Sequence, residues 1–500
     1  MRHLTQRQVS PALHPDERVL FFAHMGSAPA RSVPTVTAFL LALLITAPIA
    51  DGVFQIPVQV SDSLEAISIA VKYPSSSKLL ADSIRFSPTT FRPLRYLQSR
   101  WLLRAADVLH VSETTMFRTV HVALLLMIVV LFVVASQVRD WIDLAAFSVA
   151  FPVLIGIHTF ITMLLEAFPV NHFAEVGACA LAVLVVLQRP ARWFTPIVVC
   201  ILMILALSVI ESGAMVWVVI ACCAAAGMRG GTRPTVVAAT LLFAAYLLLR
   251  HSLGISSPGI GGHGSGFGDT FYSPEELERR FGAHPLGFML YNVTGGLASL
   301  LFAEPRQGVY SLLMAWRARQ IHPVVVINVF SSLLTTVLIA WYAWRCARAG
   351  RSRWTDRDRM FVAACGAFTI NAAFNAAYMK DEIMSVGGLL YAIAAFVALR
   401  GLFASLPDRR LVVSVCVVLI VTATTVLWAF RAVGVHYQLR YDAFKIRNDW
   451  IEVLRPDKRD DWPRDPAELA VTERLRTEAI DRRTASPSFM PRWAERYWIE

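Results

Sequence analysis

The 500-residue sequence has few charged residues. Asp, Glu, Lys and Arg make up only 17% of it, against about 25% in ordinary globular chains. Apolar residues reach 56% and aromatic residues 11%. This composition excludes a large water-facing surface, and it also excludes intrinsic disorder, which requires low hydrophobicity. The sequence therefore predicts an integral membrane protein.

Paired cysteines and nucleic-acid motifs are also missing. No two of the seven cysteines stand in CxxC spacing, so we expect neither a disulfide framework nor a metal site. Although the net charge is +11, no basic patch is interleaved with aromatic residues, and we expect no nucleic-acid partner. Residues 1–31 are polar and contain several prolines, which does not fit a cleavable signal peptide. We expect no cofactor; a divalent cation is an alternative that we do not expect.

Long apolar windows divide the chain into predicted membrane spans. An all-α protein of about eleven transmembrane helices follows, with three regions: a cytoplasmic segment 1–32, a transmembrane region 33–430 and an external extension 431–500. The spans are expected at 33–50, 119–136, 144–165, 172–188, 195–210, 213–228, 235–250, 323–344, 360–378, 384–400 and 411–430. A further stretch, 285–303, contains glycines and flanking prolines and is expected to lie in the interface.

Arginines in the short loops set the orientation. With the N-terminus inside, the loops assigned to the cytoplasm carry Arg139, Arg189, Arg229 and the 345–359 cluster, whereas the short outer loops carry only Lys380. Two long loops, 51–118 and 251–322, then fall on the outer face. We expect a multi-pass protein of the bacterial inner membrane with its active site on the periplasmic side.

Three acidic residues of the first outer loop are candidate catalytic groups. Asp51 ends the first span, and Asp62 and Glu65 lie about one turn apart at the start of a predicted helix. A carboxylate just above the membrane is suited to act as a general base, or to bind a divalent cation. The alternatives are a solvated helix end for Asp51 and an N-cap for Asp62.

Basic residues that suit a lipid phosphate follow in the same loop. Arg92 stands in Phe-Arg-Pro-Leu, just before an amphipathic stretch, 94–108, that contains Arg95 and fits a helix in the headgroup plane. An arginine fixed there is able to clamp a phosphate, although snorkelling is a simpler explanation. The remaining outer-face candidates are Lys380 for the phosphate and His172, Glu175, Glu211 and Asp381 for the acceptor or for support.

Together these elements resemble the GT-C superfamily, and within it the protein O-mannosyltransferases and related bacterial enzymes. The likeness covers roughly residues 33–250 and is carried by the acidic first loop, Phe-Arg-Pro-Leu, Arg118-Thr119-Val120-His121 and Glu211-Ser212-Gly213. The last of these is similar to a Lys-Glu-Thr-Gly element, with Ile210 at the lysine position.

The resemblance implies an inverting glycosyltransferase with a polyprenyl-phosphate-linked sugar as donor. A first-loop carboxylate is then the base, Asp62 before Asp51, with Glu65 in place of the usual paired acid. Arg92, Arg95 and Lys380 hold the lipid phosphate, and a glycine run, 261–268, closes over a glycan, lipid or protein acceptor.

Three other functions compete with this interpretation. One is a non-catalytic scaffold of an envelope assembly system, which the long tail with Trp493, Tyr497 and Trp498 would serve. An O-antigen ligase or polymerase depends on basic residues in a late outer loop, and 251–322 offers several. A multi-span transporter or lipid flippase places charges near the membrane midplane, where this sequence has few.

Overall fold

The computed structural model is a helical bundle with one short hairpin. The residues it describes are 32–60, 62–83, 91–165, 170–255, 265–267, 270–282, 285–303, 308–406, 411–453 and 465–482.

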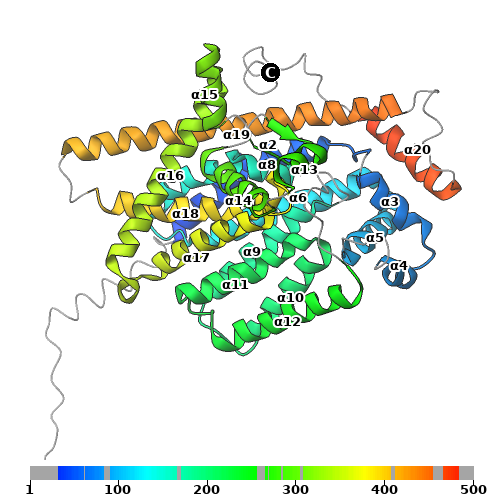
Figure 1. The fold of residues 1–500 in the computed structure, drawn as a ribbon, viewed down its shortest axis with the longest axis horizontal. Helices are drawn as coiled ribbons and strands as arrows, with labels where there is room; N and C mark the ends of the chain where they lie inside the picture. The colour runs from blue at the N-terminus through cyan, green and yellow to red at the C-terminus, as the bar shows by residue number, and fades with distance from the viewer. Residues whose placement is uncertain are drawn as a thin grey trace, which may run out of the picture.

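Most of the helices run along the long axis of the molecule (Figure 1). The elements of the first half are α2 Ser32–Gln55, α3 Asp62–Lys72, α4 Ser76–Ser83, α5 Pro93–Leu109, α6 Glu113–Ser136, α7 Trp141–Gly156, α8 His158–Leu165, α9 His172–Leu187, α10 Thr195–Val209, the 3-10 turn η2 Glu211–Gly213, α11 Ala214–Ala226 and α12 Arg233–Ser252. Those of the second half are β1 Ser265–Phe267, β2 Thr270–Tyr272, α13 Pro274–Phe281, α14 Pro285–Phe302, α15 Val309–Ala318, α16 Pro323–Ala349, η3 Arg351–Arg353, α17 Asp356–Asn371, η4 Ala372–Asn375, η5 Asp381–Met384, α18 Ser385–Ala404, α19 Leu411–Val453 and α20 Pro466–Asp481. The two strands pair antiparallel.

A helix lies on each of the eleven expected segments, but fewer of them are long enough to cross a membrane. Among the residues that the structure describes, six helices qualify by length and composition, and up to eight do if two bent helix pairs are counted as one span each. Helices α9 and α10 have 16 and 15 residues, whereas a span needs roughly 20. The chain is thus a helical protein with six to eight candidate spans. The sequence 285–303 is helix α14, which meets α13 at 116°.

One expected span, 144–165, is broken in the structure. Helices α7 and α8 meet at 59°, with Ile157 in an extended conformation between them. Pro152 lies inside α7, and a proline removes a backbone hydrogen bond from the helix. Just before the break, a Cβ atom on Gly156 would lie 3.0 Å from Cβ of Arg431, so glycine allows α19 to approach here.

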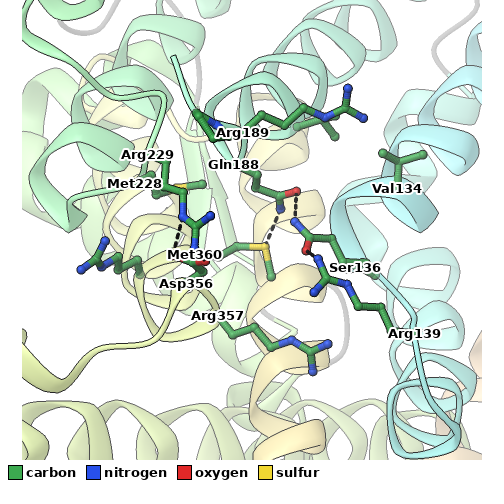
Figure 2. Close-up of a pocket in the computed structure, with 14 residues that line it drawn as sticks. Val134, Ser136, Arg139, Gln188, Arg189, Met228, Arg229, Asp356, Arg357 and Met360 are labelled. Carbon is green, nitrogen blue, oxygen red and sulfur yellow. Dashed lines mark hydrogen bonds and ion pairs between the residues drawn. The ribbon is translucent and has the colours of Figure 1, made fainter. Parts of the chain in front are cut away.

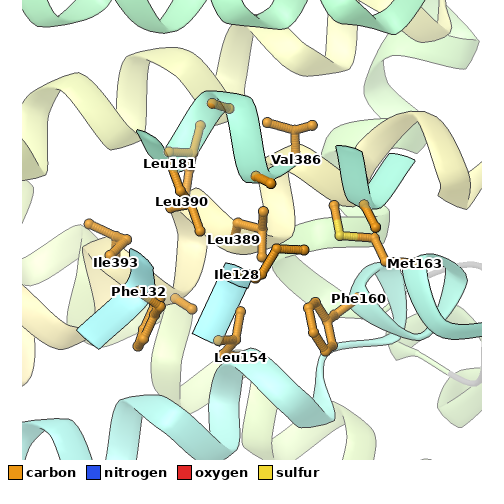
Figure 3. Packing of buried hydrophobic residues seen from close by; sticks show 14 of the residues in the cluster. Ile128, Phe132, Leu154, Phe160, Met163, Leu181, Val386, Leu389, Leu390 and Ile393 are labelled. Atoms are coloured by element: carbon orange, nitrogen blue, oxygen red, sulfur yellow. The ribbon is translucent and has the colours of Figure 1, made fainter. Parts of the chain in front are cut away.

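The centre of the bundle is helix α18. Its sequence is apolar on all sides, as expected for a helix surrounded by other helices, and it packs mainly on α7 and α17. Figure 3 shows Leu389, Leu390 and Ile393 of α18 among side chains from α6, α7, α8 and α9. A Cβ atom on Gly388 would lie 2.2 Å from Oγ1 of Thr159; small residues of this kind allow close helix packing in membranes.

The first outer loop folds into three helices at one end of the bundle (Figure 1). A helix begins at Asp62, and α5 covers the predicted amphipathic stretch 94–108, which confirms both predicted helices. Arg100 of α5 joins them: its guanidinium donates to the carbonyl oxygens of Ala70 (3.0 Å), Pro74 (2.8 Å) and Tyr73. These carbonyls follow from the end of α3, where the helix dipole favours a cation.

Replacing Arg100 by glutamine is expected to destabilise this three-helix unit. Hydrogen bonds from a charged donor are worth about 1.5–3 kcal/mol, and glutamine cannot reach all three carbonyls. Hydrogen exchange of α3 and α4 should therefore accelerate in the Arg100→Gln variant. Arg104→Gln, which changes an exposed residue one turn later on α5, serves as the control. Equal exchange in the two variants would contradict the role of Arg100.

The C-terminal part differs from the expected last span at 411–430. Helix α19 continues without interruption for 43 residues, about 65 Å at 1.5 Å per residue. Arg431 therefore lies within a helix; it is buried and donates to Oγ of Ser331 and of Ser332, each at 2.9 Å.

Helix α20 returns to the first-loop helices. Glu468 pairs with Lys72 of α3 at 2.5 Å, and Arg474 pairs with Glu113 of α6 at 2.6 Å. The backbone N–H of Thr114 donates to Glu478. The C-terminal extension and the first outer loop therefore lie at the same end of the molecule.

Candidate functional site

The two short motif elements of the sequence meet in an ion pair. Arg92 of Phe-Arg-Pro-Leu donates from Nε (2.9 Å) and Nη2 (2.8 Å) to Oε2 of Glu211. The backbone N–H of Phe91 donates to the other carboxylate oxygen at 3.1 Å. Pro93 begins helix α5 directly after Arg92. A proline at the first helical position restricts the backbone of the residue before it, here Arg92. Both bonds use Nε and Nη2, so Nη1 of Arg92 remains for a further acceptor.

A second arginine contacts the same carboxylate. Arg250, in the last turn of α12, lies 3.6 Å from Oε1 of Glu211 and donates to the hydroxyl of Tyr246 at 3.2 Å. The side chains of Arg92, Glu211 and Arg250 are 21%, 29% and 12% exposed. Two cations thus contact one anion in a half-buried place, and arginines in such a place are suited to bind a phosphate group.

The phenol of Tyr96 lies among further charges of the same region. Burial raises the pKa of Tyr96, and the charges of Arg95, Glu65, Arg92 and Glu211 act on it. Arg95 is buried and Glu65 is exposed. Helices α3 and α5 and the turn η2 therefore bring four of the predicted site residues into one neighbourhood, which we call the Arg92 site (Glu65, Arg92, Arg95, Glu211 and Arg250).

His172 and Glu175 extend this region along the first turn of α9. His172 Nδ1 lies 3.2 Å from Oε2 of Glu175, and Gln98 of α5 donates to Oε1 of the same carboxylate. Gln98 and Arg95 are three positions apart on α5 and therefore lie on the same face of the helix. Of the predicted support residues, Glu175 is thus in contact with α5, and His172 is in contact with Glu175.

The other predicted residues lie apart from these contacts. Asp381 is buried and accepts a hydrogen bond from Ser299 of α14 at 3.0 Å, and His158 Nε2 lies 2.9 Å from the same hydroxyl. Lys380 next to it is exposed, with its ammonium 5.7 Å from the ring centre of Tyr378. No described contact joins Lys380 or Asp381 to Arg92.

The three acidic residues of the first loop lie on different helices: Asp51 is on α2, and Asp62 and Glu65 are on α3. Asp51 is exposed in the last turns of α2, and its charge acts on His436 of α19, not on the Arg92 site. Asp62 is the first residue of α3, one turn before Glu65, and its side chain lies outside the described residues. Most of the glycine run 261–268 also lies outside them; only 265–267 are described, as strand β1.

Sequence reasoning did not find Arg250, Tyr246 and Gln98. Arg250 stands at the end of an expected span, where an arginine ordinarily snorkels to the interface. No local pattern marks its contact with Glu211, which lies 39 positions earlier. The only signal was Glu211 itself, an acid between two apolar helices and in need of a cation.

Within the residues that the structure describes, no group of three or more His, Cys, Asp or Glu side chains is arranged to hold a metal ion. Comparison with known proteins adds no name: no family model, no curated protein and no solved structure matches this chain.

Proposed function

We propose that this protein is a glycosyltransferase of the bacterial inner membrane, GT-C-like, that takes its sugar from a polyprenyl-phosphate donor. In this proposal the chain crosses the membrane eleven times from a cytoplasmic N-terminus, and the reaction takes place on the periplasmic face. The observation that supports it most is the Arg92–Glu211 ion pair with Arg250 beside it. It joins two of the elements on which the GT-C resemblance rests, Phe-Arg-Pro-Leu and Glu211-Ser212-Gly213.

The proposed reaction is a single displacement with inversion. The acceptor hydroxyl attacks the anomeric carbon, the bond from that carbon to the phosphate oxygen breaks, and polyprenyl phosphate leaves. Arg92, Arg250 and Arg95 stabilise the negative charge that grows on the leaving phosphate. Asp62 accepts the proton of the acceptor hydroxyl. Glu211 holds Arg92 and Arg250 in place, and Glu175, with His172 beside it, supports α5 through Gln98.

Binding of the leaving group tests the phosphate role directly. We expect full-length protein in nanodiscs to bind undecaprenyl phosphate, and Arg92→Gln to weaken that binding about 10-fold or more, the loss of one charge-assisted contact of about 1.5–3 kcal/mol. Arg104→Gln, on the exposed side of the same helix, is the matched control. If both variants bind as the wild type does, the Arg92 site does not hold the phosphate.

Transfer is expected to need no metal ion, because the arginines supply the positive charge that a cation supplies elsewhere. The rate of sugar transfer from a panel of undecaprenyl-phosphate sugars should stay within twofold after treatment with EDTA. A loss that added Mg²⁺ or Mn²⁺ restores would show that a divalent cation takes part.

One observation favours a transporter or flippase as the second candidate. Broken helices with polar groups at the break are typical of transporters, and here His158, Ser299 and Asp381 meet next to the α7–α8 bend. If the wild-type protein moves fluorescent undecaprenyl phosphate across liposomes without transfer and Asp381→Asn abolishes that movement, the transporter is the better assignment.

A further inference from the structure

A second basic site lies at the opposite end of the bundle from the Arg92 site. It is a cavity of about 370 Å³ between the C-terminal ends of α6 and α9, the α11–α12 turn and the start of α17. Helix α9 connects the two sites: His172 is at its first turn and Arg189 lies just beyond its end, so its 16 residues separate them by about 24 Å. Nothing in the proposed transfer reaction uses this cavity.

Arginine dominates the lining of the cavity. Its charged residues are five arginines and one carboxylate, namely Arg139, Arg189, Arg229, Arg357, Arg359 and Asp356. Figure 2 shows them around Gln188, which donates to Sδ of Met360 at 2.8 Å and accepts from Gln137 at 2.9 Å. The arginines come from four separate segments of the chain, so their convergence is a property of the fold and not of one basic stretch.

Four of the arginines are held by groups of the protein, among them Arg139, which donates to Oε1 of Gln137 at 2.5 Å. Arg357 donates to the buried carboxylate of Asp143 at 2.5 and 2.7 Å. Arg359 donates to the carbonyl of Gly227 at 2.9 Å, and Arg229 pairs with Asp356 at 2.6 Å. These contacts fix the walls of the cavity but leave more positive than negative charge around it.

Arg189 has no such partner. Within the described part of the chain its guanidinium takes part in no hydrogen bond, ion pair or ring contact, and it is exposed at the cavity mouth. The positive-inside rule accounts for the number of arginines in these loops, but it does not require them to line a common cavity. Here Arg189 and Arg229 border one cavity whose inner wall also contains the apolar side chains of Val134, Val185 and Met228.

The surroundings place the cavity at headgroup level. Trp141 and Trp193, 65% and 83% exposed, stand at the starts of α7 and α10 next to it, and exposed tryptophans mark the membrane interface. A volume of this size is within the range of small-ligand sites, and arginine clusters recognise phosphate through paired N–H donors.

We propose that this cavity binds a phosphate-bearing anion, with Arg189 and Arg229 as the residues that contact it. A lipid headgroup and a soluble phosphate compound offer the same chemistry. This proposal does not depend on the proposed transfer reaction and stands even if that reaction is disproved.

The experiment uses full-length protein in nanodiscs and two probes. Pyrophosphate, titrated calorimetrically into phosphatidylcholine nanodiscs, tests the soluble source. Native mass spectrometry of protein released from mixed phosphatidylglycerol and phosphatidylcholine membranes tests the lipid source by counting retained phosphatidylglycerol. The test variant is Arg189→Gln with Arg229→Gln. The matched control is Arg348→Gln with Arg353→Gln, which removes two exposed arginines of the same end that do not line the cavity.

We expect the test variant to weaken pyrophosphate binding at least 10-fold, or to lose the retained phosphatidylglycerol, while the control changes either quantity less than twofold. Loss with pyrophosphate identifies a soluble ligand, and loss with phosphatidylglycerol alone identifies a lipid. If both variants lose binding equally, or neither probe distinguishes the test variant from the wild type, the cavity is not a phosphate site.

Discussion

Asp62→Asn is expected to lower the rate of sugar transfer by about 10²–10⁴-fold, the usual contribution of a general base. Asparagine has nearly the same shape as aspartate, but its amide cannot accept the proton that the acceptor hydroxyl must lose. Asp62 is the first residue of α3, and α3 packs on α5, which carries Arg92 and Arg95. The base therefore lies on the element next to the proposed phosphate contacts. The rate is measured with undecaprenyl-phosphate sugars at saturating donor.

One further variant and one further measurement show whether the effect belongs to Asp62. Asp107→Asn removes an exposed carboxylate from the same outer loop, on α5, and should leave the rate within twofold of the wild type. Donor binding by the Asp62→Asn variant should be unchanged, because the base contacts the acceptor and not the lipid phosphate. Full transfer by Asp62→Asn would move the base elsewhere. Glu65 would be tested before Asp51, because the charge of Glu65 acts on Tyr96 of α5, whereas no described contact joins Asp51 to the Arg92 site.

The positions of the helices could be predicted because they depend on local sequence. Apolar runs near the length of a span fix where α6, α16 and α18 lie, and an N-cap pattern fixes the start of α3 at Asp62. The number of spans could not be predicted in the same way. A 16-residue apolar helix such as α9 is equally compatible with a short span and with a helix buried inside the bundle, and only packing decides between the two.

The candidate site was predictable in its members but not in its contacts. Arg92, Arg95 and Glu211 were singled out by charge at the ends of apolar segments. That Arg92 binds Glu211, 119 positions later, depends on how α5 is placed against α10 and η2, and no periodicity encodes that. The contacts of Arg431 could not be predicted either: α19 continues past it, and Ser331 and Ser332 of α16 provide its buried partners.

Asp143→Asn is expected to cause the largest loss of stability. The carboxylate of Asp143 is fully buried at the start of α7 and binds both Arg357 (2.5 Å) and Arg400 (3.0 Å). It also accepts the backbone N–H of Arg139 at 2.9 Å. Removing the anion from a buried ion pair costs about 3–5 kcal/mol, because the cations lose their counter-charge. We expect a loss of stability at the lower end of this range, because the side chains of Arg357 and Arg400 are 22% and 32% exposed and are able to turn toward water.

An exposed ion pair, Arg229 with Asp356, provides the control for this prediction. Asp356→Asn removes an anion of the same membrane end that pairs with Arg229, but both partners are more than half exposed, and such pairs contribute about 0–1 kcal/mol. Thermal unfolding in detergent should therefore show a large decrease of Tm for Asp143→Asn and almost none for Asp356→Asn. Asp143 connects α7 to α17 and α18 at the end of the bundle opposite the first loop. The decrease of Tm should therefore appear even when donor and acceptor are absent. Equal Tm values for the two variants would mean that the Asp143 network does not hold these helices together.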